Sequence, residues 1–230
     1  MAETQGPYRC VAVLETSSSA DMDALHAAWA ANDPFGDLAS EGVTRYVRGF
    51  AVATDDPVLL RRGRIGIAHL FVPDAATALV LNVKLRAGEV HGRHPQLGNA
   101  RIIAMPLVQR FRLGVEDDFG QTPLRAIYLV KGRDDIGPTG FHDHWRGVHG
   151  PLLIGQAGVT RYAQNHRLTD SYDAGPEFDG LAEMSFPDEA ANAVFSNSEP
   201  HRTNQVNDLP NAFDLNVGKR FYTREETIFG

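Results

Sequence analysis

The chain has 230 residues, 43% apolar and 22% charged, a composition that indicates a folded globular protein and argues against extensive disorder. Its 22 Lys and Arg against 29 Asp and Glu give a formal charge of −7, which disfavours binding to nucleic-acid phosphates. A single cysteine excludes an internal disulfide and a multi-cysteine zinc site.

The N-terminal sequence lacks the basic region and apolar run of a signal peptide. No stretch of about 18 apolar residues suggests a membrane-spanning helix. We therefore expect a cytoplasmic protein with neither a nucleic acid nor a membrane as partner.

Six elements are predicted in the first half of the chain. They are a strand, a helix, two strands, a helix and a strand, at residues 9–15, 22–31, 43–50, 65–72, 75–81 and 103–111. Cys10 lies in the first apolar strand and is expected to be a core thiol. A polar stretch at 115–122 follows and is expected to be a linker.

The second half predicts the same order of elements. Strands are expected at 125–131, 159–166, 180–186 and around 217–223, with helices at 141–149 and 189–195. Thr139 and Asp188 are the expected N-caps of these helices. Phe141, Trp145 and Val148 fall at helical spacing and are expected to form the apolar face of the first helix.

An internal repeat links the two halves. Gly42–Tyr46 recurs unchanged as Gly158–Tyr162, and the same shift of 116 residues places His26 on His142 and Trp29 on Trp145. We therefore predict two domains, a degenerate repeat at 1–115 and a repeat with the fuller motif at 120–230.

The order βαββαβ in each repeat is the ferredoxin-like plan. Helices cover one face of such a sheet, and the bare face must be buried, which a second copy can do. The predicted fold class is therefore α+β, with two tandem ferredoxin-like units forming an intrachain pseudo-dimeric α+β barrel. The interior of such a barrel suits a small molecule.

The second repeat resembles the EthD family of the dimeric α+β barrel superfamily. The resemblance rests on Phe141-His-Asp-His-Trp145, His149-Gly-Pro151 and Val159-Thr-Arg-Tyr162 with Asn165-His166. The first repeat keeps His26, Trp29 and Val43–Tyr46, but has Asp33-Pro34-Phe35 for His-Gly-Pro and Gly49-Phe50 for Asn-His. The resemblance implies a relative of polyketide cyclases, anthrone dehydratase-like proteins and proteins of ether or aromatic degradation. Such relatives mostly work without a metal or organic cofactor.

Histidines of the second repeat are the candidate acid–base groups. His149 ends the first predicted helix, where it could face the barrel mouth and exchange protons near neutral pH, or favour the helix C-terminus electrostatically. His142 could be catalytic or make a local hydrogen bond, whereas His144 is expected to face solvent. Trp145 is expected to be a packing residue.

Tyr162 and His166 are also catalytic candidates, because they share one face of a predicted strand with Gln164. If that face lines the interior, they can orient a carbonyl or a phenol. If helices cover it, Tyr162 is a core residue and His166 lies at the strand end. Asn165 and Arg161 belong to the opposite face, so both sets can line one pocket only with a bulge between them.

The candidate substrate-binding residues are Gln164, Asn165, Arg161, Glu183 and His69. Glu183 occupies the strand position that His69 has in the first repeat. It is either a buried general base with a raised pKa or an outward-facing strand residue. The His91 to His94 segment and the basic run at residues 61–64 are expected at the surface.

We expect a cofactor-independent enzyme that acts on an aromatic or polyketide-like small molecule by histidine-mediated proton transfer, in a cyclase, dehydratase or isomerase-like reaction. One alternative is a non-catalytic ligand-binding or stress-related barrel. Another is a haem- or metal-dependent oxidoreductase, because imidazoles such as those of His142, His144, His149 and His166 suit zinc and iron. A homodimer is possible but not required, since one chain supplies both units.

Overall fold

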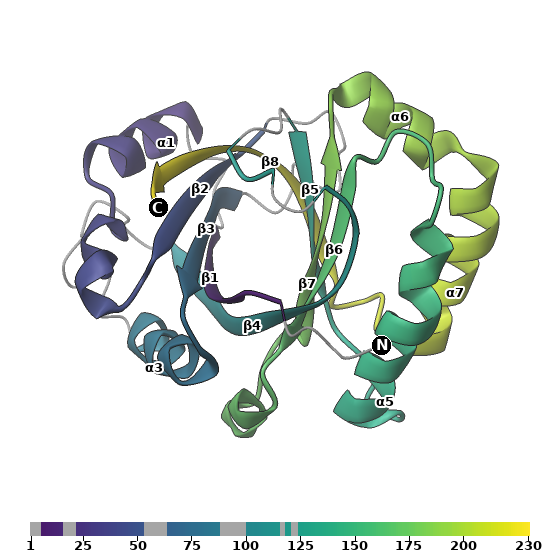
Figure 1. Cartoon of the computed structure of the whole chain (residues 1–230), viewed down its shortest axis with the longest axis horizontal. Coiled ribbons are helices and arrows are strands. Elements are labelled where there is room, and N and C mark those ends of the chain that lie inside the picture. The colour runs from purple at the N-terminus through teal and green to yellow at the C-terminus, as the bar shows by residue number, and fades with distance from the viewer. Residues whose placement is uncertain (1–5, 16–21, 53–63, 88–99, 116–117, 121–123) are drawn as a thin grey trace. The chain divides into compact units, whose positions relative to one another are not determined.

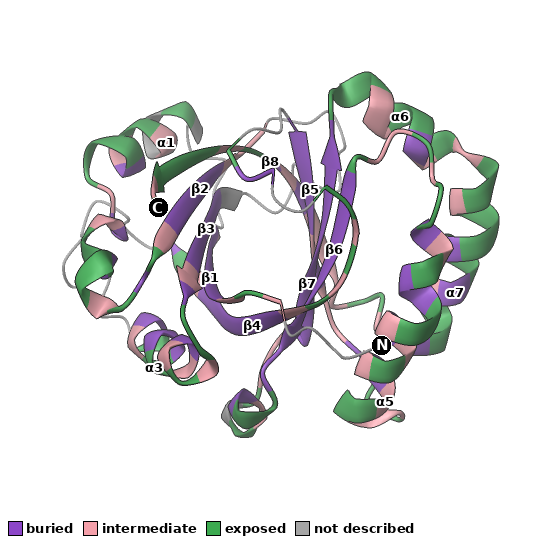
Figure 2. Cartoon of the chain, in the orientation of Figure 1, coloured by how far each residue is buried: buried purple, intermediate pink, exposed green. Residues whose placement is uncertain are grey.

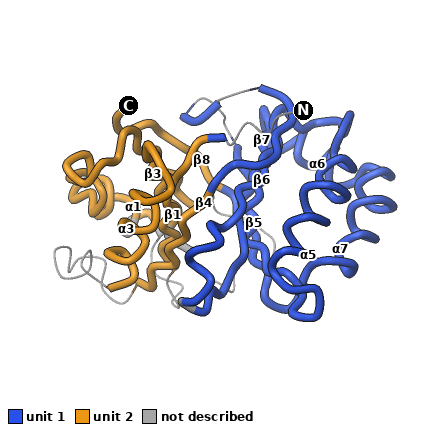
Figure 3. The backbone as a smooth tube through the Cα atoms, turned by 60° about the horizontal axis from the view of Figure 1, so that its bottom comes forward, with its two compact units in different colours: residues 1–6, 108–222 blue, residues 7–107, 223–230 orange. Residues whose placement is uncertain are grey.

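A computed structural model describes residues 6–15, 22–52, 64–87, 100–115, 118–120 and 124–230 (Figure 1). The chain divides into two compact units (Figure 3). Unit 1 comprises residues 1–6 and 108–222, and unit 2 comprises residues 7–107 and 223–230. The His91 to His94 segment and residues 61–63 of the basic run lie outside the described residues.

Unit 2 is an antiparallel sheet in the order β1-β3-β2-β8, with α1 and α3 on one face (Figure 1). Trp29 lies against Gly66 of β3 on this face. Cys10 of β1 is fully buried, as expected. The elements in chain order are β1 (Tyr8–Glu15), α1 (Met22–Ala31), a 3₁₀ helix (Gly36–Glu41), β2 (Arg45–Ala51), β3 (Arg64–Val72), α3 (Ala75–Arg86), the first part of β4 (Arg101–Gly114) and the last part of β8 (Lys219–Phe229).

Unit 1 has the sheet order β5-β7-β6-β4, with α5, α6 and α7 on one face (Figure 1). Its strands are β5 (Leu124–Val130), β6 (Arg161–Arg167) and β7 (Gly180–Phe186). Its helices are α5 (Gly137–His144), α6 (Glu189–Asn197) and α7 (Val206–Ala212). Short helical segments at Trp145–His149, Gly150–Leu153, Thr169–Ala174 and His201–Gln205 complete it. The strands are buried along almost their whole length, whereas the helices keep an exposed face (Figure 2).

The eight strands follow one another in the order β1-β3-β2-β8-β5-β7-β6-β4, which is that of a closed barrel. The predicted α+β class with tandem ferredoxin-like repeats is confirmed. The helical segments at His201–Gln205 and Val206–Ala212 are additions that the βαββαβ plan lacks. No helix in the described part of the chain is long and apolar enough to cross a membrane.

Of the two predicted N-caps in the second repeat, one is confirmed and one is wrong. Asp188 caps α6 as expected, because its side chain accepts a hydrogen bond from the Ala191 N–H at 2.7 Å. The prediction for Thr139 is wrong. The helix begins two residues earlier, at Gly137, with Pro138 in its first turn, where a missing N–H costs nothing.

A close contact between Gly180 of β7 and the Trp145 ring holds the α5 segment against the sheet of unit 1. A Cβ atom on Gly180 would lie 2.5 Å from Trp145 Cζ3 and 2.8 Å from the Asn165 carbonyl oxygen. We expect Gly180→Ala to lower the free energy of unfolding by about 1–3 kcal/mol through overpacking, measured by urea denaturation. The control is Gly147→Ala, whose Cβ would meet nothing within 4 Å. Equal stability of both variants would contradict this packing.

Candidate functional site in unit 1

The helix-covered face of the unit 1 sheet carries Tyr162, Gln164 and His166. In β6 they pair with Met184, Ala182 and Gly180 of β7, and Gly180 is the residue that touches Trp145. All three side chains are buried. Of the two alternatives left open by the sequence, the structure therefore selects the helix-covered face.

A π-helical turn at Trp145–His149 decides where the histidine of this segment lies. The Gly150 N–H donates to the Trp145 carbonyl, so one extra residue enters the turn. Val148 consequently lies outside, with 47% of its surface exposed, and His149 lies inside, with 7% exposed. The prediction that Val148 belongs to the apolar face is wrong, because it assumed a regular α-helical period.

His149 forms a buried pair with Asp208 of α7. His149 Nδ1 lies 2.9 Å from Asp208 Oδ2, and the neutral imidazole donates this hydrogen bond. Burial lowers the pKa of His149 below its ordinary value, although the Asp208 carboxylate acts to raise it. At neutral pH the imidazole is therefore uncharged.

Asp208 also binds His144 and Asn211. His144 Nε2 lies 3.0 Å from Asp208 Oδ1, and Asn211 Nδ2 donates to the same oxygen at 3.1 Å. Burial acts to raise the pKa of Asp208, but the hydrogen bonds from Asn211, His149 and His144 outweigh it and hold this pKa below its usual value. The prediction that His144 faces solvent is wrong, since its ring is bound to a carboxylate.

Because Nδ1 of His149 carries the ring proton, Nε2 is the ring nitrogen with a lone pair that can accept a proton. Among the residues that the structure describes, no hydrogen-bond partner is recorded for this nitrogen. A neutral histidine whose Nδ1–H is held by a carboxylate has the tautomer and the orientation of a general base. The pair can therefore remove a proton from a bound molecule that reaches Nε2.

A second group of side chains links His142 to His166. Their Nδ1 atoms lie 2.8 Å apart, and His142 Nε2 lies 2.8 Å from the hydroxyl of Tyr172. Gln164 Oε1 can only accept, so His166 Nε2 donates to it at 3.3 Å. With both rings neutral, His166 Nδ1 then accepts from His142, and His142 Nε2 accepts from Tyr172.

Burial explains why both rings of this group stay neutral. It lowers the pKa of His142 to about 4, and burial together with the neighbouring His142 lowers the pKa of His166 to about 2. Burial and the Asp179 carboxylate raise the pKa of Tyr172, so its hydroxyl keeps its proton. Burial likewise raises the pKa of Tyr162. These groups donate and accept hydrogen bonds without carrying charge near neutral pH.

The opposite face of the same sheet carries Arg161, Asn165 and Glu183. Asn165 Nδ2 donates to Glu183 Oε2 at 3.0 Å, and Arg161 Nη1 lies 3.6 Å from the same oxygen. Arg161 Nη2 also donates to Gln109 Oε1 at 2.9 Å. No bulge interrupts the register of β6 with β7, so the two sets of side chains lie on opposite faces. Arg161 and Tyr162 nevertheless line one hollow together at the start of β6, which contradicts the expectation for this pair.

Unit 2 replaces the histidine site with an ion pair. Asp33 stands where unit 1 has His149, and it accepts hydrogen bonds from Arg48 at 2.9 Å and from the Tyr46 hydroxyl at 3.0 Å. Phe50 stands where unit 1 has His166, and it stacks on His26 at 4.5 Å. In the part of the chain that the structure describes, the second repeat therefore has this histidine site and the first repeat does not.

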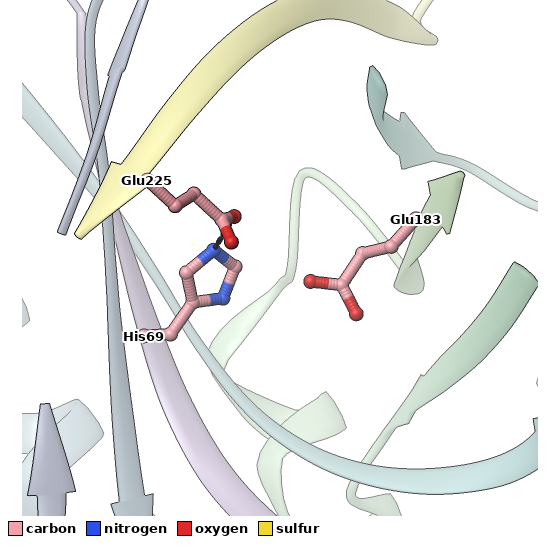
Figure 4. A group of neighbouring side chains, drawn as sticks. All are labelled: His69, Glu183 and Glu225. Atoms are coloured by element: carbon pink, nitrogen blue, oxygen red, sulfur yellow. Dashed lines mark ion pairs between the residues drawn. The ribbon is translucent and has the colours of Figure 1, made fainter. Parts of the chain in front are cut away.

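His69 belongs to a buried polar group of unit 2. Arg9 Nη1 donates to His69 Nδ1 at 3.1 Å, and His69 Nε2 lies 3.2 Å from Glu225 Oε1 (Figure 4). The side chains of His69 and Glu225 are fully buried. The structure thus places His69 between a cation and a carboxylate on the face of the sheet that the helices do not cover.

The described part of unit 1 contains two hollows near the candidate residues. The larger, of about 290 Å³, is mostly apolar, and its lining includes Leu113, Leu153, Ile154, Val159 and Tyr162. The smaller, of about 110 Å³, includes Lys131, Tyr172 and Asp179. Within either unit, the described residues form no group of three or more His, Cys, Asp and Glu ligands close enough to share a metal ion.

Sequence reasoning missed Asp208 and Tyr172. Asp208 lies 59 residues after His149 in the chain, in a short helix that contains Pro210 and has no counterpart in the predicted plan. Tyr172 lies in a short 3₁₀ segment after β6. Neither belongs to the repeat or to a spacing motif, so only the folded chain reveals them.

Comparison with known proteins agrees with this picture. Residues 133–215 match the model of the EthD domain. The matched segment contains His142, His149, His166 and Asp208, so the whole histidine site lies within the EthD domain. No curated protein sequence matches the chain.

Three solved structures show the fold over almost the whole chain. An anthrone oxidase-like protein has a TM-score of 0.67 at 9% identity, covering 99% of this chain and 95% of its own. A protein from Fusobacterium nucleatum, described as a candidate monooxygenase, has a TM-score of 0.57 at 9% identity. The match covers 99% of this chain and 97% of that protein. A similarly described protein from Lactobacillus acidophilus has a TM-score of 0.50 at 10% identity. The match covers 95% of this chain and 94% of that protein. Residues 133–215 thus match the EthD domain, and the chain as a whole has the α+β barrel fold.

Proposed function

We propose that the EthD domain is an acid–base enzyme that acts on an aromatic or polyketide-like small molecule, without a metal or organic cofactor. The observation that carries this proposal is the His149–Asp208 pair, at 2.9 Å, with a neutral imidazole and Nε2 as its basic atom. The reaction class is that of cyclases, dehydratases and isomerases, which need a positioned base more than a redox group.

The first chemical step is removal of a carbon-bound proton from a carbon that is next to a carbonyl or conjugated with it. His149 Nε2 takes the proton, and the C–H electron pair moves into the carbonyl group to form an enolate. The imidazolium that results is stabilised by Asp208, as in other carboxylate-oriented histidines. Return of the proton to another atom completes an isomerisation. In a dehydration, a hydroxyl group takes this proton from the imidazolium and leaves as water while the enolate electrons form a C=C bond.

The pocket of about 290 Å³ is the site that we propose for the apolar body of the substrate. Its lining includes Leu153, the last residue of the 3₁₀ segment that follows His149. A 3₁₀ segment rises about 2 Å per residue, so about 8 Å separates Leu153 from His149 along the chain. A fused-ring aromatic molecule spans such a distance. The name of the anthrone oxidase-like neighbour supports a substrate of this kind.

The remaining candidates have supporting roles in this proposal. His142 and His166 are hydrogen-bonded to other side chains of the domain, so we assign them to holding the site rather than to contacting substrate. Tyr162 lines the proposed pocket, so we propose that it borders the apolar body of the substrate. We propose no substrate contact for Asn165, Glu183 or His69, because their side chains occupy the faces that the helices of their units leave uncovered. Arg161 lines the proposed pocket, so we keep it as a substrate-binding candidate.

Proton exchange tests the proposal without knowledge of the final product. Anthrone, a three-ring ketone, would be incubated with the protein in D₂O. Its acidic C–H bonds belong to the CH₂ carbon of the central ring, which is conjugated with the carbonyl through the fused rings. We expect deuterium uptake at that carbon to exceed the buffer rate by about 100-fold or more, followed by NMR. Binding without exchange would favour the ligand-binding alternative. Visible absorbance and metal analysis of the active protein test the haem or metal alternative.

Narrowing the pocket should weaken this exchange. Ile154 lines the pocket and is 66% exposed, so Ile154→Trp adds bulk at the mouth without disturbing the core. We expect KM to rise about tenfold, a loss of about 1.4 kcal/mol in binding free energy, because the larger side chain leaves less room for the substrate. Val194→Trp is the matched control, because Val194 is 55% exposed on α6 and lies outside the pocket. A similar KM for both variants would place the substrate elsewhere.

A further inference from the structure

We propose that Gln164 is a positioning residue that holds the Trp145–His149 turn in its π form and thereby sets His149 beside Asp208. This inference rests on the proposed function, because it explains how the base reaches its place. It assigns to Gln164 a role other than the substrate binding expected from the sequence.

The Trp145 carbonyl is the point at which Gln164 acts. This oxygen accepts the Gly150 N–H of the π turn, and it also accepts Gln164 Nε2 at 2.6 Å. A carbonyl oxygen has two lone pairs, so the two donors together satisfy it. A π turn is rare in helices, and a buried side-chain donor at its first carbonyl favours this form over the regular helix.

The amide of Gln164 is itself held in one orientation. Nε2 also donates to the Tyr162 hydroxyl at 3.0 Å, and Oε1 accepts from His166 Nε2 at 3.3 Å. The side chain is fully buried. The His142–His166 pair therefore acts on His149 through Gln164, by fixing the direction in which its N–H groups point.

The backbone of the turn comes directly against this amide. A Cβ atom on Gly150 would lie 2.8 Å from Gln164 Nε2 and 3.1 Å from the Phe111 ring. A larger residue at position 150 would have to displace the Gln164 amide or the Phe111 ring, so Gly150 allows the amide to reach the turn.

Unit 2 supplies a comparison within the same chain. Arg48 occupies the position of Gln164 and donates to Asp33 instead of to a helix carbonyl. The helix α1 ends at Ala31 as a regular α-helix, with no π turn. The repeat that lacks the glutamine also lacks the π turn and the imidazole.

The first test uses the unmodified protein. Both N–H groups of the Gln164 amide are donated inside the domain, whereas Gln156 Nε2 donates to the Leu152 carbonyl in a half-buried site. We expect hydrogen exchange of the Gln164 side-chain amide, followed by NMR, to be at least tenfold slower than that of Gln156. Equal rates would contradict the proposed clamp.

The second test removes the donor but keeps the shape. Gln164→Glu cannot donate to the Trp145 carbonyl as a carboxylate, and Gln156→Leu is the control that deletes a glutamine-to-backbone hydrogen bond elsewhere. In Gln164→Glu we expect the hydrogen of the Gly150 backbone amide to exchange at least tenfold faster. We also expect the ¹⁵N spectrum of the His149 ring to show that the Nδ1–H tautomer no longer predominates. Gly150→Ala should give the same spectrum.

The outcomes separate this inference from the proposed function. An unchanged His149 tautomer in Gln164→Glu overturns the positioning role, even if His149→Ala abolishes proton exchange on anthrone. If Gln164→Glu loses the Nδ1–H tautomer of His149, the positioning role is supported. If His149→Ala then has no effect on proton exchange, the proposed function is wrong although the positioning role stands. Unfolding of Gln164→Glu also counts against the inference, since a clamp that only orders one turn leaves the sheet intact.

Discussion

Replacing His149 by alanine is expected to lower kcat/KM for deuterium exchange on anthrone by about 100-fold to 10,000-fold, the contribution typical of a general base. The reason is that His149 Nε2 is the basic atom of the site, held by Asp208 at 2.9 Å from Nδ1. KM should change little, because the imidazole acts on the transition state rather than on the apolar body of the substrate.

The matched control is His26→Ala. His26 occupies the corresponding helix of unit 2, where it stacks on Phe50, so its removal should leave the exchange rate unchanged. Full exchange activity in His149→Ala would remove His149 from the mechanism.

The pH dependence of this rate follows from the neutral imidazole. Burial places the pKa of His149 below the ordinary value of about 6.5, so the base is uncharged above that pH. The rate should fall with decreasing pH only below about 6.5, as Nε2 gains a proton. If the midpoint of this fall in rate lies above pH 6.5, the titrating group is not His149.

The largest expected effect on stability is destabilisation in acid. The folded protein keeps His142 and His166 neutral down to pKa values of about 4 and about 2, whereas both rings take up protons in the unfolded chain near pH 6.5. Below pH 6.5 the unfolded state therefore binds more protons, and the free energy of unfolding falls as the pH falls. Above that pH the contribution is fully present.

Each imidazole contributes a slope of about 1.4 kcal/mol per pH unit in this window. We expect the free energy of unfolding, measured in urea at pH 7, 5.5 and 4.5, to fall by about 5 kcal/mol between pH 7 and pH 4.5. His166→Phe, which copies the Phe50 of unit 2, should roughly halve this fall. A wild-type stability that does not change with pH would show that the two rings are not held neutral.

The fold class was predictable because its signals are local or repeated. The GVTRY repeat revealed two copies, and alternating apolar residues marked each strand of the sheet. His149 could be chosen as a candidate base because it stands before Gly150-Pro151, a helix end that the sequence shows. The Asp188 cap was likewise predictable, because a cap acts within three residues.

Tertiary structure alone decided how these residues are used. A regular helical period placed Val148 inside, but the π turn exchanged it for His149, and that turn depends on Gln164 from a strand that follows it in the chain. Asp208 joins His149 across 59 residues. A sequence determines the faces of its elements through short-range periodicity. Hydrogen bonds between distant side chains form only once those elements pack together, and they determine which histidine is oriented as a base.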